Sequence, residues 1–197
     1  GDAEEETQTG CRSLVKAGTE YGKDIVQHAW WRLCQSIRIS TSVITDLRLS
    51  NVGLNPAYLL MLADGFAGGS YLQEEMRTID LHKNSDLTGP RFGEQADELD
   101  EFLSKFGTIA ELNVSGCGLG NSGAKTIGKH LHRISALNIV NNPFIGVEGA
   151  KFIADSVITT DEKDCRVRLR LPGADDGSLT SQTRLTLFSG YKKRISH

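Results

Sequence analysis

Residues 109–131 read IAELNVSGCGLGNSGAKTIGKHL. Apolar or small side chains occupy the first, fourth, sixth, ninth and eleventh positions of this stretch, which are Ile109, Leu112, Val114, Cys117 and Leu119. Side chains alternate along a strand, so Leu112 and Val114 point to the same side, which we take to be the core. Cys117 stands where the chain turns away from the sheet, and a small side chain there can pack or hydrogen-bond among backbone groups. The stretch therefore predicts a short buried strand, a tight turn and then a helix.

The same spacing recurs along the chain. It returns 25 residues later as Ile134, Leu137, Ile139, Asn142 and Phe144, and the Gly-x-x-Gly-Ala of residues 120–124 returns at 146–150. One upstream unit contains Ile44, Leu47, Leu49 and Leu54, with Val52 in the position of Cys117. Another contains Met76, Ile79, Leu81 and Asn84, with Leu87 displaced by one residue. This recurrence predicts four repeats.

With these residues the chain resembles the ribonuclease-inhibitor type of leucine-rich repeat protein, over roughly residues 36–160. The resemblance implies an α/β fold, a leucine-rich repeat solenoid (horseshoe). Such a solenoid has a parallel β-sheet on its concave face and α-helices on its convex face. The resemblance identifies a fold and not an individual protein.

We expect a single leucine-rich repeat domain over residues 1–197. Its parts are an acidic tail and lead-in (1–23), an N-terminal helical cap (24–43), four repeats (44–160), and C-terminal closing strands with a basic tail (161–197). The cap helix is expected to bury a stripe of Ile25, Ala29, Leu33 and Ile37, flanked by Val26 and Trp30. Further helices are predicted over 58–66, 94–106 and 147–158, and strands over 77–82, 166–171 and 183–188.

Composition is that of an ordinary soluble protein, with 39% hydrophobic and 24% charged residues. No run approaches the ~20 apolar residues of a membrane helix, and the acidic N-terminus does not read as a signal peptide, so we expect a cytoplasmic (intracellular) protein. The four cysteines form no CxxC pair and are expected to be buried thiols. The net charge of −3 is uneven, because residues 165–197 carry +5 and the rest carry −8.

Two motifs imitate nucleotide-binding sites. Gly118, Gly120 and Gly123 spell GxGxxG between a predicted strand and a predicted helix. A dinucleotide site needs an acid at the end of the next strand, where this chain has residues 139–142 without a carboxylate. A P-loop fails because Ala124 separates glycine from lysine. We therefore expect no cofactor.

The histidines predict neither catalysis nor metal binding. His130 and His132 are two residues apart on a helix, hence on different sides of it, and cannot share one metal ion. His82 follows Asp80 and can titrate with it, but no nucleophile is placed to complete a triad. We expect surface histidines, no metal and no enzyme activity. The carboxylates of residues 94–101 are expected to face solvent.

The candidate partner-binding residues stand at the position between the two buried strand residues. These are Arg48, Asp80, Asn113 and Asn138, with His82 beside them, and Arg48 and Asp80 are expected to form a cross-strand pair. If Leu169 and Leu171 take the buried positions of a last strand, alternation adds Arg168 and Arg170, and Leu185 with Leu187 adds Arg184. Such a basic pole favours an acidic partner segment. The alternative is that Asp175, Asp176 or the N-terminal acids neutralise these arginines.

The sequence thus predicts a non-catalytic protein–protein interaction module or scaffold that uses the concave sheet face. A second hypothesis is a regulator of a nucleotide-driven partner, since the GTPase-activating protein of Ran and the actin-capping tropomodulins look like this class of solenoid. A third is an anionic partner bound at the basic end. Nucleic acid is disfavoured by the net charge of −3, and neither a membrane nor a small-molecule substrate is expected.

Overall fold

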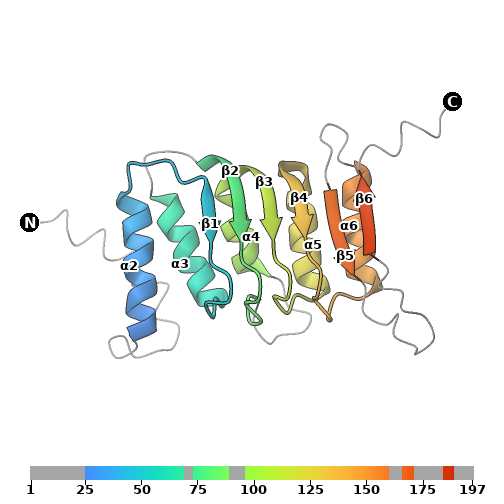
Figure 1. Ribbon diagram of the computed structural model, residues 1–197, viewed down its shortest axis with the longest axis horizontal. Coiled ribbons are helices and arrows are strands. Elements are labelled where there is room, and N and C mark those ends of the chain that lie inside the picture. The colour runs from blue at the N-terminus through green and yellow to red at the C-terminus, as the bar shows by residue number, and fades with distance from the viewer. Residues whose placement is uncertain (1–24, 69–72, 89–95, 160–165, 171–183, 189–197) are drawn as a thin grey trace, which may run out of the picture.

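The computed structural model describes residues 25–68, 73–88, 96–159, 166–170 and 184–188 (Figure 1). The strands are β1 (Asp46–Arg48), β2 (Gln73–Asp80), β3 (Phe106–Asn113), β4 (Ile134–Asn138), β5 (Arg166–Arg170) and β6 (Arg184–Phe188). The helices are α2 (Ile25–Ile39), α3 (Pro56–Ala67), α4 (Asp97–Ser104), α5 (Asn121–His130), the 3₁₀ turn η1 (Leu131–Arg133) and α6 (Val147–Thr159). Within these residues, no helix has the length and apolar character that crossing a bilayer requires.

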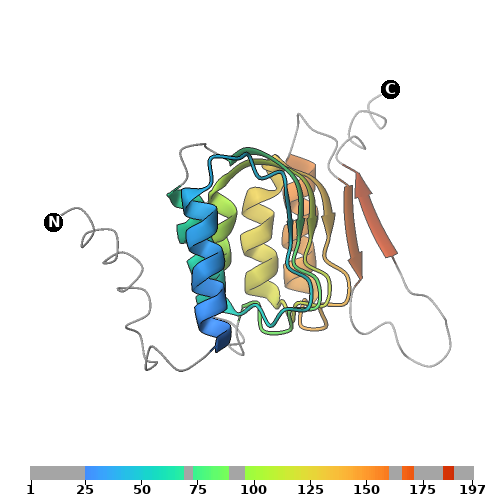
Figure 2. The ribbon, with the colours of Figure 1, turned by 60° about the vertical axis from the view of Figure 1, so that its left-hand side comes forward.

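The six strands form one sheet in chain order, β1 to β6. Neighbouring strands from β1 to β5 are parallel, and β6 runs antiparallel to β5. The helices lie together on one face of this sheet (Figure 2). We call the other side, which carries Arg48, Asp80, Asn113 and Asn138, the open face. The arrangement is an α/β repeat fold.

The predicted core register is confirmed. Leu47 pairs with Ile79, Ile79 with Leu112, and Leu112 with Leu137 on successive parallel strands. All four side chains are buried, with exposed fractions of 7%, 0%, 0% and 1%. One residue of each strand from β1 to β4 therefore contributes to an apolar row beneath the helices.

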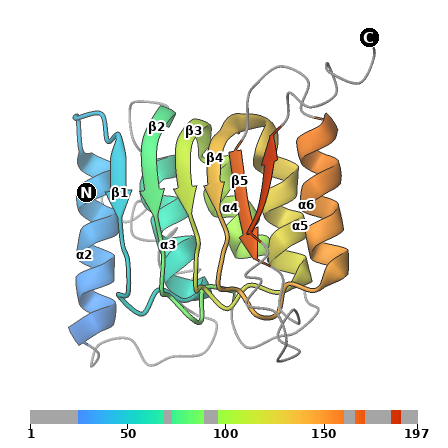
Figure 3. The same cartoon turned by 45° about the vertical axis from the view of Figure 1, so that its right-hand side comes forward.

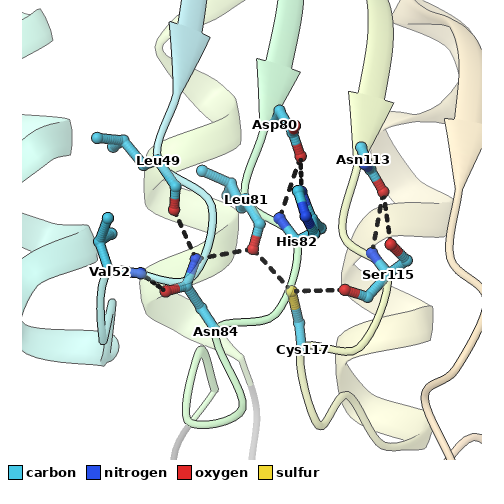
Figure 4. A network of polar contacts seen from close by, with 9 residues as sticks. All are labelled: Leu49, Val52, Asp80, Leu81, His82, Asn84, Asn113, Ser115 and Cys117. Atoms are coloured by element: carbon cyan, nitrogen blue, oxygen red, sulfur yellow. Dashed lines mark hydrogen bonds and ion pairs between the residues drawn. The ribbon is translucent and has the colours of Figure 1, made fainter.

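Asn84 ties the second repeat to the first. Its Oδ1 accepts hydrogen bonds from the backbone N–H groups of Val52 (3.0 Å) and Leu54 (2.9 Å). Its Nδ2 donates to the carbonyls of Leu49 (2.7 Å) and Leu81 (2.8 Å) (Figure 4). The side chain is 1% exposed, so one amide satisfies four backbone groups at a place that water does not reach.

Asn142 makes the same link between the fourth repeat and the third. Its Oδ1 accepts from the N–H groups of Cys117 (2.9 Å) and Leu119 (3.0 Å), and its Nδ2 donates to the carbonyls of Val114 (3.0 Å) and Ile139 (2.9 Å). We call the Asn84 and Asn142 side chains the asparagine rungs. Each rung reaches back from its own turn to the preceding repeat.

Cys117 occupies the same position in the third repeat. Its thiol donates to the carbonyl of Leu81 at 3.0 Å (Figure 4). Burial raises the pKa of this thiol to about 11, so it stays protonated and unreactive at neutral pH. In the first repeat the position holds Val52, which is exposed. The described element before this repeat is the helix α2, so an asparagine here would have no turn of a preceding repeat to bind.

The residue before the rung position adopts a left-handed backbone conformation in each turn. Asn51 has φ +53°, Lys83 +60°, Gly116 +65° and Asn141 +58°, and all four precede the rung position directly. Asparagine and glycine tolerate this conformation best. Lys83 is the departure, since it is neither asparagine nor glycine.

Helix α2 forms as expected, but the predicted stripe was wrong in part. The buried side chains are Trp30, Cys34 and Ile37, whereas Ala29 and Leu33 are exposed. The inward face is thus rotated toward Cys34. The packing of α3 against α2 accounts for this rotation. A Cβ atom at Gly65 of α3 would lie 3.0 Å from the Cys34 carbonyl oxygen, so the lack of a side chain there lets the two helices pack closely at Cys34.

Some helices and strands begin or end at other residues than predicted, where apolar residues continue from one element into the next. β2 begins at Gln73 and ends at Asp80, while residues 77–82 were predicted; helix α4 is shorter than the predicted 94–106. Phe106, expected on that helix, starts β3 and is still buried, with its ring 5.1 Å from Phe102 and 5.0 Å from Phe66. In the fourth repeat Phe144 was predicted to be buried, but it is 49% exposed and Ile145 takes its place.

Candidate functional site

The open face brings the predicted residues into one row. Arg48 pairs in register with Asp80, Asp80 with Asn113, Asn113 with Asn138, and Asn138 with Arg168. The strands that carry them lie side by side with the helices behind (Figure 3). The spacing of neighbouring strands is about 4.8 Å, so the row can be spanned by a single extended segment of another chain. We call these five residues the polar row.

Two members of the polar row are held by the residue two positions later. Asp80 Oδ1 accepts from the His82 backbone N–H (3.2 Å) and lies 2.8 Å from His82 Nδ1. Asn113 Oδ1 accepts from the Ser115 N–H (3.2 Å) and the Ser115 hydroxyl (2.8 Å) (Figure 4). The ends of β2 and β3 thus each form a small polar turn that fixes one side chain on the open face.

Asn138 breaks this pattern because the residue two positions later is Val140, which has no side-chain donor. Its Oδ1 is buried and has no hydrogen-bond partner among the described residues. A buried acceptor without a donor costs about 1 to 3 kcal/mol. The fourth repeat therefore contains a buried side-chain oxygen without a donor.

The predicted cross-strand ion pair of Arg48 and Asp80 was wrong. The Arg48 guanidinium lies 3.9 Å from Asp46 of its own strand, and Asp80 is engaged by His82. The stronger pair is Arg77 with Asp46, in which Nε lies 3.1 Å from both carboxylate oxygens and Nη2 2.6 Å from Oδ2. Hydrogen bonding by Arg77 lowers the pKa of Asp46 to about 2. Sequence reasoning missed this pair because it considered one position per strand.

The register of the last strands also corrects the prediction. Val167, not Leu169, pairs with Leu137, so Arg168 still enters the polar row, but Arg170 lies two residues beyond it. Arg170 pairs with Arg184 on β6. Leu171, Asp175, Asp176 and the acidic N-terminal tail lie outside the described residues.

Charge is divided across the sheet. Strands β1 to β3 contain five acidic residues and two arginines, a net charge of −3. Strands β4 to β6 contain four arginines and no acidic residue, a net charge of +4. The sheet therefore has an acidic half and a basic half, and the border between them falls at Asn113 and Asn138.

Comparison with protein families supports the repeat assignment. Residues 108–128 match the family described as Leucine Rich repeat. The chain carries a leucine-rich repeat. The match covers the stretch from β3 to α5, where Leu112, Val114, Cys117 and Leu119 are buried. Comparison with curated proteins finds no significant match.

The glycines of the GxGxxG motif have a packing role in this leucine-rich repeat. Gly118 has φ +69°, and a Cβ atom there would lie 2.2 Å from the Ser85 carbonyl oxygen of the preceding repeat. Gly149, which lies in α6 at the position that Gly123 has in α5, leaves room for Asn121, whose Oδ1 accepts from the N–H groups of Gly146 (2.8 Å) and Gly149 (3.2 Å). These contacts account for the recurring glycines without a nucleotide.

His130 was expected at the surface, but it is buried. Its Nε2 lies 2.8 Å from Oδ1 of Asp100 on α4, whose side chain is still 45% exposed. Burial lowers the pKa of His130, against the opposing effect of Asp100. Among the described residues no group of three His, Cys, Asp or Glu side chains is placed to hold a metal ion.

Proposed function

We propose that this chain is a non-catalytic protein-interaction module of the ribonuclease-inhibitor type, a horseshoe solenoid that binds its partner on the open face of its sheet. Leucine-rich repeats generally mediate protein–protein interaction, which supports the general part of the proposal. The particular observation that carries it is the polar row, in which residues of five strands share one register position.

The chemistry of the row favours recognition over reaction. Its members are an acid held by a histidine, two amides and two arginines, all of which hydrogen-bond to peptide groups and to charged side chains. The thiol of Cys117 has its pKa raised to about 11, which is opposite to the activation that a nucleophile needs. These features support a binding surface, and we propose that an acidic segment of the partner is held at the arginines of β5 and β6.

The test is capture of partners by the full chain and by two variants. Asn113→Tyr places a bulky neutral side chain at the centre of the open face. Lys151→Glu alters an exposed residue of α6 in the helix layer and serves as the control. We expect Asn113→Tyr to lose proteins that both the wild type and Lys151→Glu retain, with all three chains unfolding at similar temperatures. Retention of the same proteins by Asn113→Tyr would overturn the proposal.

A further inference from the structure

We propose that the N-terminal end of the sheet binds an extended segment of another protein as an additional strand, which lies parallel to β1 and beneath α2. This inference goes beyond the proposed function, because it concerns the end of the sheet and not its open face. Among the described residues β1 is the first strand of the sheet and pairs with β2 alone (Figure 1). Five of the seven large apolar side chains that are exposed in the described part of the chain lie within residues 26–52, at this same end.

The backbone of β1 has hydrogen-bonding groups that point away from β2. The Leu49 N–H donates to the Asp80 carbonyl (2.8 Å), and the Thr45 carbonyl accepts an N–H of β2 (3.1 Å). Since backbone groups alternate along a strand, the N–H and carbonyl groups of Asp46 and Arg48 face the outer edge of the sheet. Such an edge is a template for pairing with a strand of another chain.

The side of α2 that faces the sheet layer is apolar and partly exposed. Helix α2 packs against α3 at Cys34. Successive residues of a helix are about 100° apart, so Val26, Leu33 and Ile37 share one side of α2 next to that contact. Ile37 is buried in the core, so this side points inward, whereas Leu33 is 37% and Val26 52% exposed. An additional strand beyond β1 lies beneath these two side chains and covers them.

The first turn has the same character as the strand and the helix before it. Asn84 and Asn142 bind the turn of the preceding repeat, and the Cys117 thiol binds a carbonyl of the preceding repeat. Val52 stands at the equivalent position and is 44% exposed. The surface by which each later repeat packs on the one before it is therefore exposed in the first repeat. A bound strand continues the interface that already joins the repeats.

These features specify the chemistry of the bound segment. Side chains alternate along a strand, so the segment needs apolar residues at two alternate positions to cover Val26 and Leu33. On the open face the Arg48 side chain is 70% exposed and lies 3.9 Å from Asp46, whose carboxylate is already engaged by Arg77. An acidic residue between the two apolar ones pairs with Arg48 across the strands.

The sequence that precedes α2 does not match this description. Residues 1–24 contain two large aliphatic residues, Leu14 and Val15, which are adjacent. Alternation would send them to opposite sides of a strand, so only one of them could contact α2. We therefore assign the additional strand to another protein.

The experiment measures, by anisotropy, how a fluorescein-labelled peptide binds to the full chain. The peptide copies residues 105–116, in which Leu112 and Val114 are the apolar pair, and carries Asn113→Glu as the acid. In the protein, Leu33→Glu places a charge on the inward side of α2, and Val147→Glu makes a similar change at an exposed residue of α6. We expect Leu33→Glu to weaken binding about tenfold and Val147→Glu less than about twofold, because a charge is costly to bury in an apolar contact.

Two N-methylated peptides test the hydrogen bonding without changing the protein. In β3 the Val114 N–H donates to the Asn138 carbonyl of the next strand (2.9 Å). By the same geometry the Leu112 N–H of the peptide faces β1 and the N–H of the following residue faces away. We expect N-methylation at Leu112 to weaken binding about tenfold and N-methylation at the following residue to leave the affinity unchanged.

Absence of peptide binding, equal affinity for the wild type and Leu33→Glu, or equal effects of the two N-methyl groups would each overturn the inference. If Leu33→Glu unfolds, the N-methylated peptides still decide. Sedimentation equilibrium tests the other occupant: a wild type that self-associates and a monomeric Leu33→Glu variant would assign this end to a second copy of the chain and overturn the inference as well. Capture of partners that depends on Asn113 while the peptide fails to bind would leave the proposed function in place.

Discussion

The Asn142 rung provides the sharpest test of how the repeats hold together. Asn142→Ala removes four short hydrogen bonds to the backbone of two repeats, at distances of 2.9 to 3.0 Å. The Asn142 side chain is 1% exposed, so water does not replace them easily. At about 1 kcal/mol for each lost bond, the free energy of unfolding should fall by about 4 kcal/mol. That is a large part of the 5 to 15 kcal/mol that is typical of a folded domain.

The assay is equilibrium unfolding in urea, followed by circular dichroism, for the wild type, Asn142→Ala and Asn138→Ala. The control residue is also an asparagine of the fourth repeat, but it makes no side-chain hydrogen bond to the described residues. Its replacement removes a buried oxygen that has no donor, so the unfolding free energy should stay the same or rise. A loss below about 1.5 kcal/mol in Asn142→Ala, or equal losses in the two variants, would refute the reasoning.

Three further outcomes are expected. Leu112→Ala, at a side chain that is 0% exposed, should lower the unfolding free energy by about 2 to 5 kcal/mol in the same assay, and a loss below about 1 kcal/mol contradicts the core register. Gly118→Ala should destabilise the chain because its Cβ atom would meet the Ser85 carbonyl oxygen. Gly53→Ala is the control, since Gly53 has the same φ but no atom within 4 Å of such a Cβ, and it should lower the melting temperature less. Equal melting temperatures of the two variants would refute this steric argument. Burial lowers the pKa of His130 below 6.5, so the folded chain binds this proton less readily than the unfolded chain, and the free energy of unfolding should fall as the pH drops below about 6.5. His130→Gln should reduce that fall. An unchanged dependence of stability on pH in this variant would contradict the role of His130.

Much of the fold was accessible from spacing alone. Leu47, Ile79, Leu112 and Leu137 were placed correctly because strand alternation and the repeat period leave one register that buries all of them. The same logic put Arg48, Asp80, Asn113 and Asn138 in one row. These successes depend on the sequence pattern being strictly periodic over several repeats.

The errors arise where periodicity leaves a choice. A shift of two residues preserves alternation, so the pattern Arg-Val-Arg-Leu-Arg could not tell Val167 from Leu169 as the partner of Leu137. The inward face of α2 was decided by a glycine on another helix. Pairings such as Arg77 with Asp46 and His130 with Asp100 join residues 31 and 30 positions apart, and no local pattern predicts them.

The asparagine rungs also bear on the order in which the repeats can be completed during synthesis. The backbone N–H groups of Val52 and Leu54 have their acceptor in Asn84, which follows 32 and 30 residues later. Those of Cys117 and Leu119 have theirs in Asn142, 25 and 23 residues later. A ribosome synthesises the chain from its N-terminus, so each of these turns is made before the asparagine that binds it. The N–H groups of the first and third turns therefore have no asparagine acceptor until the following repeat has been synthesised and has left the ribosome.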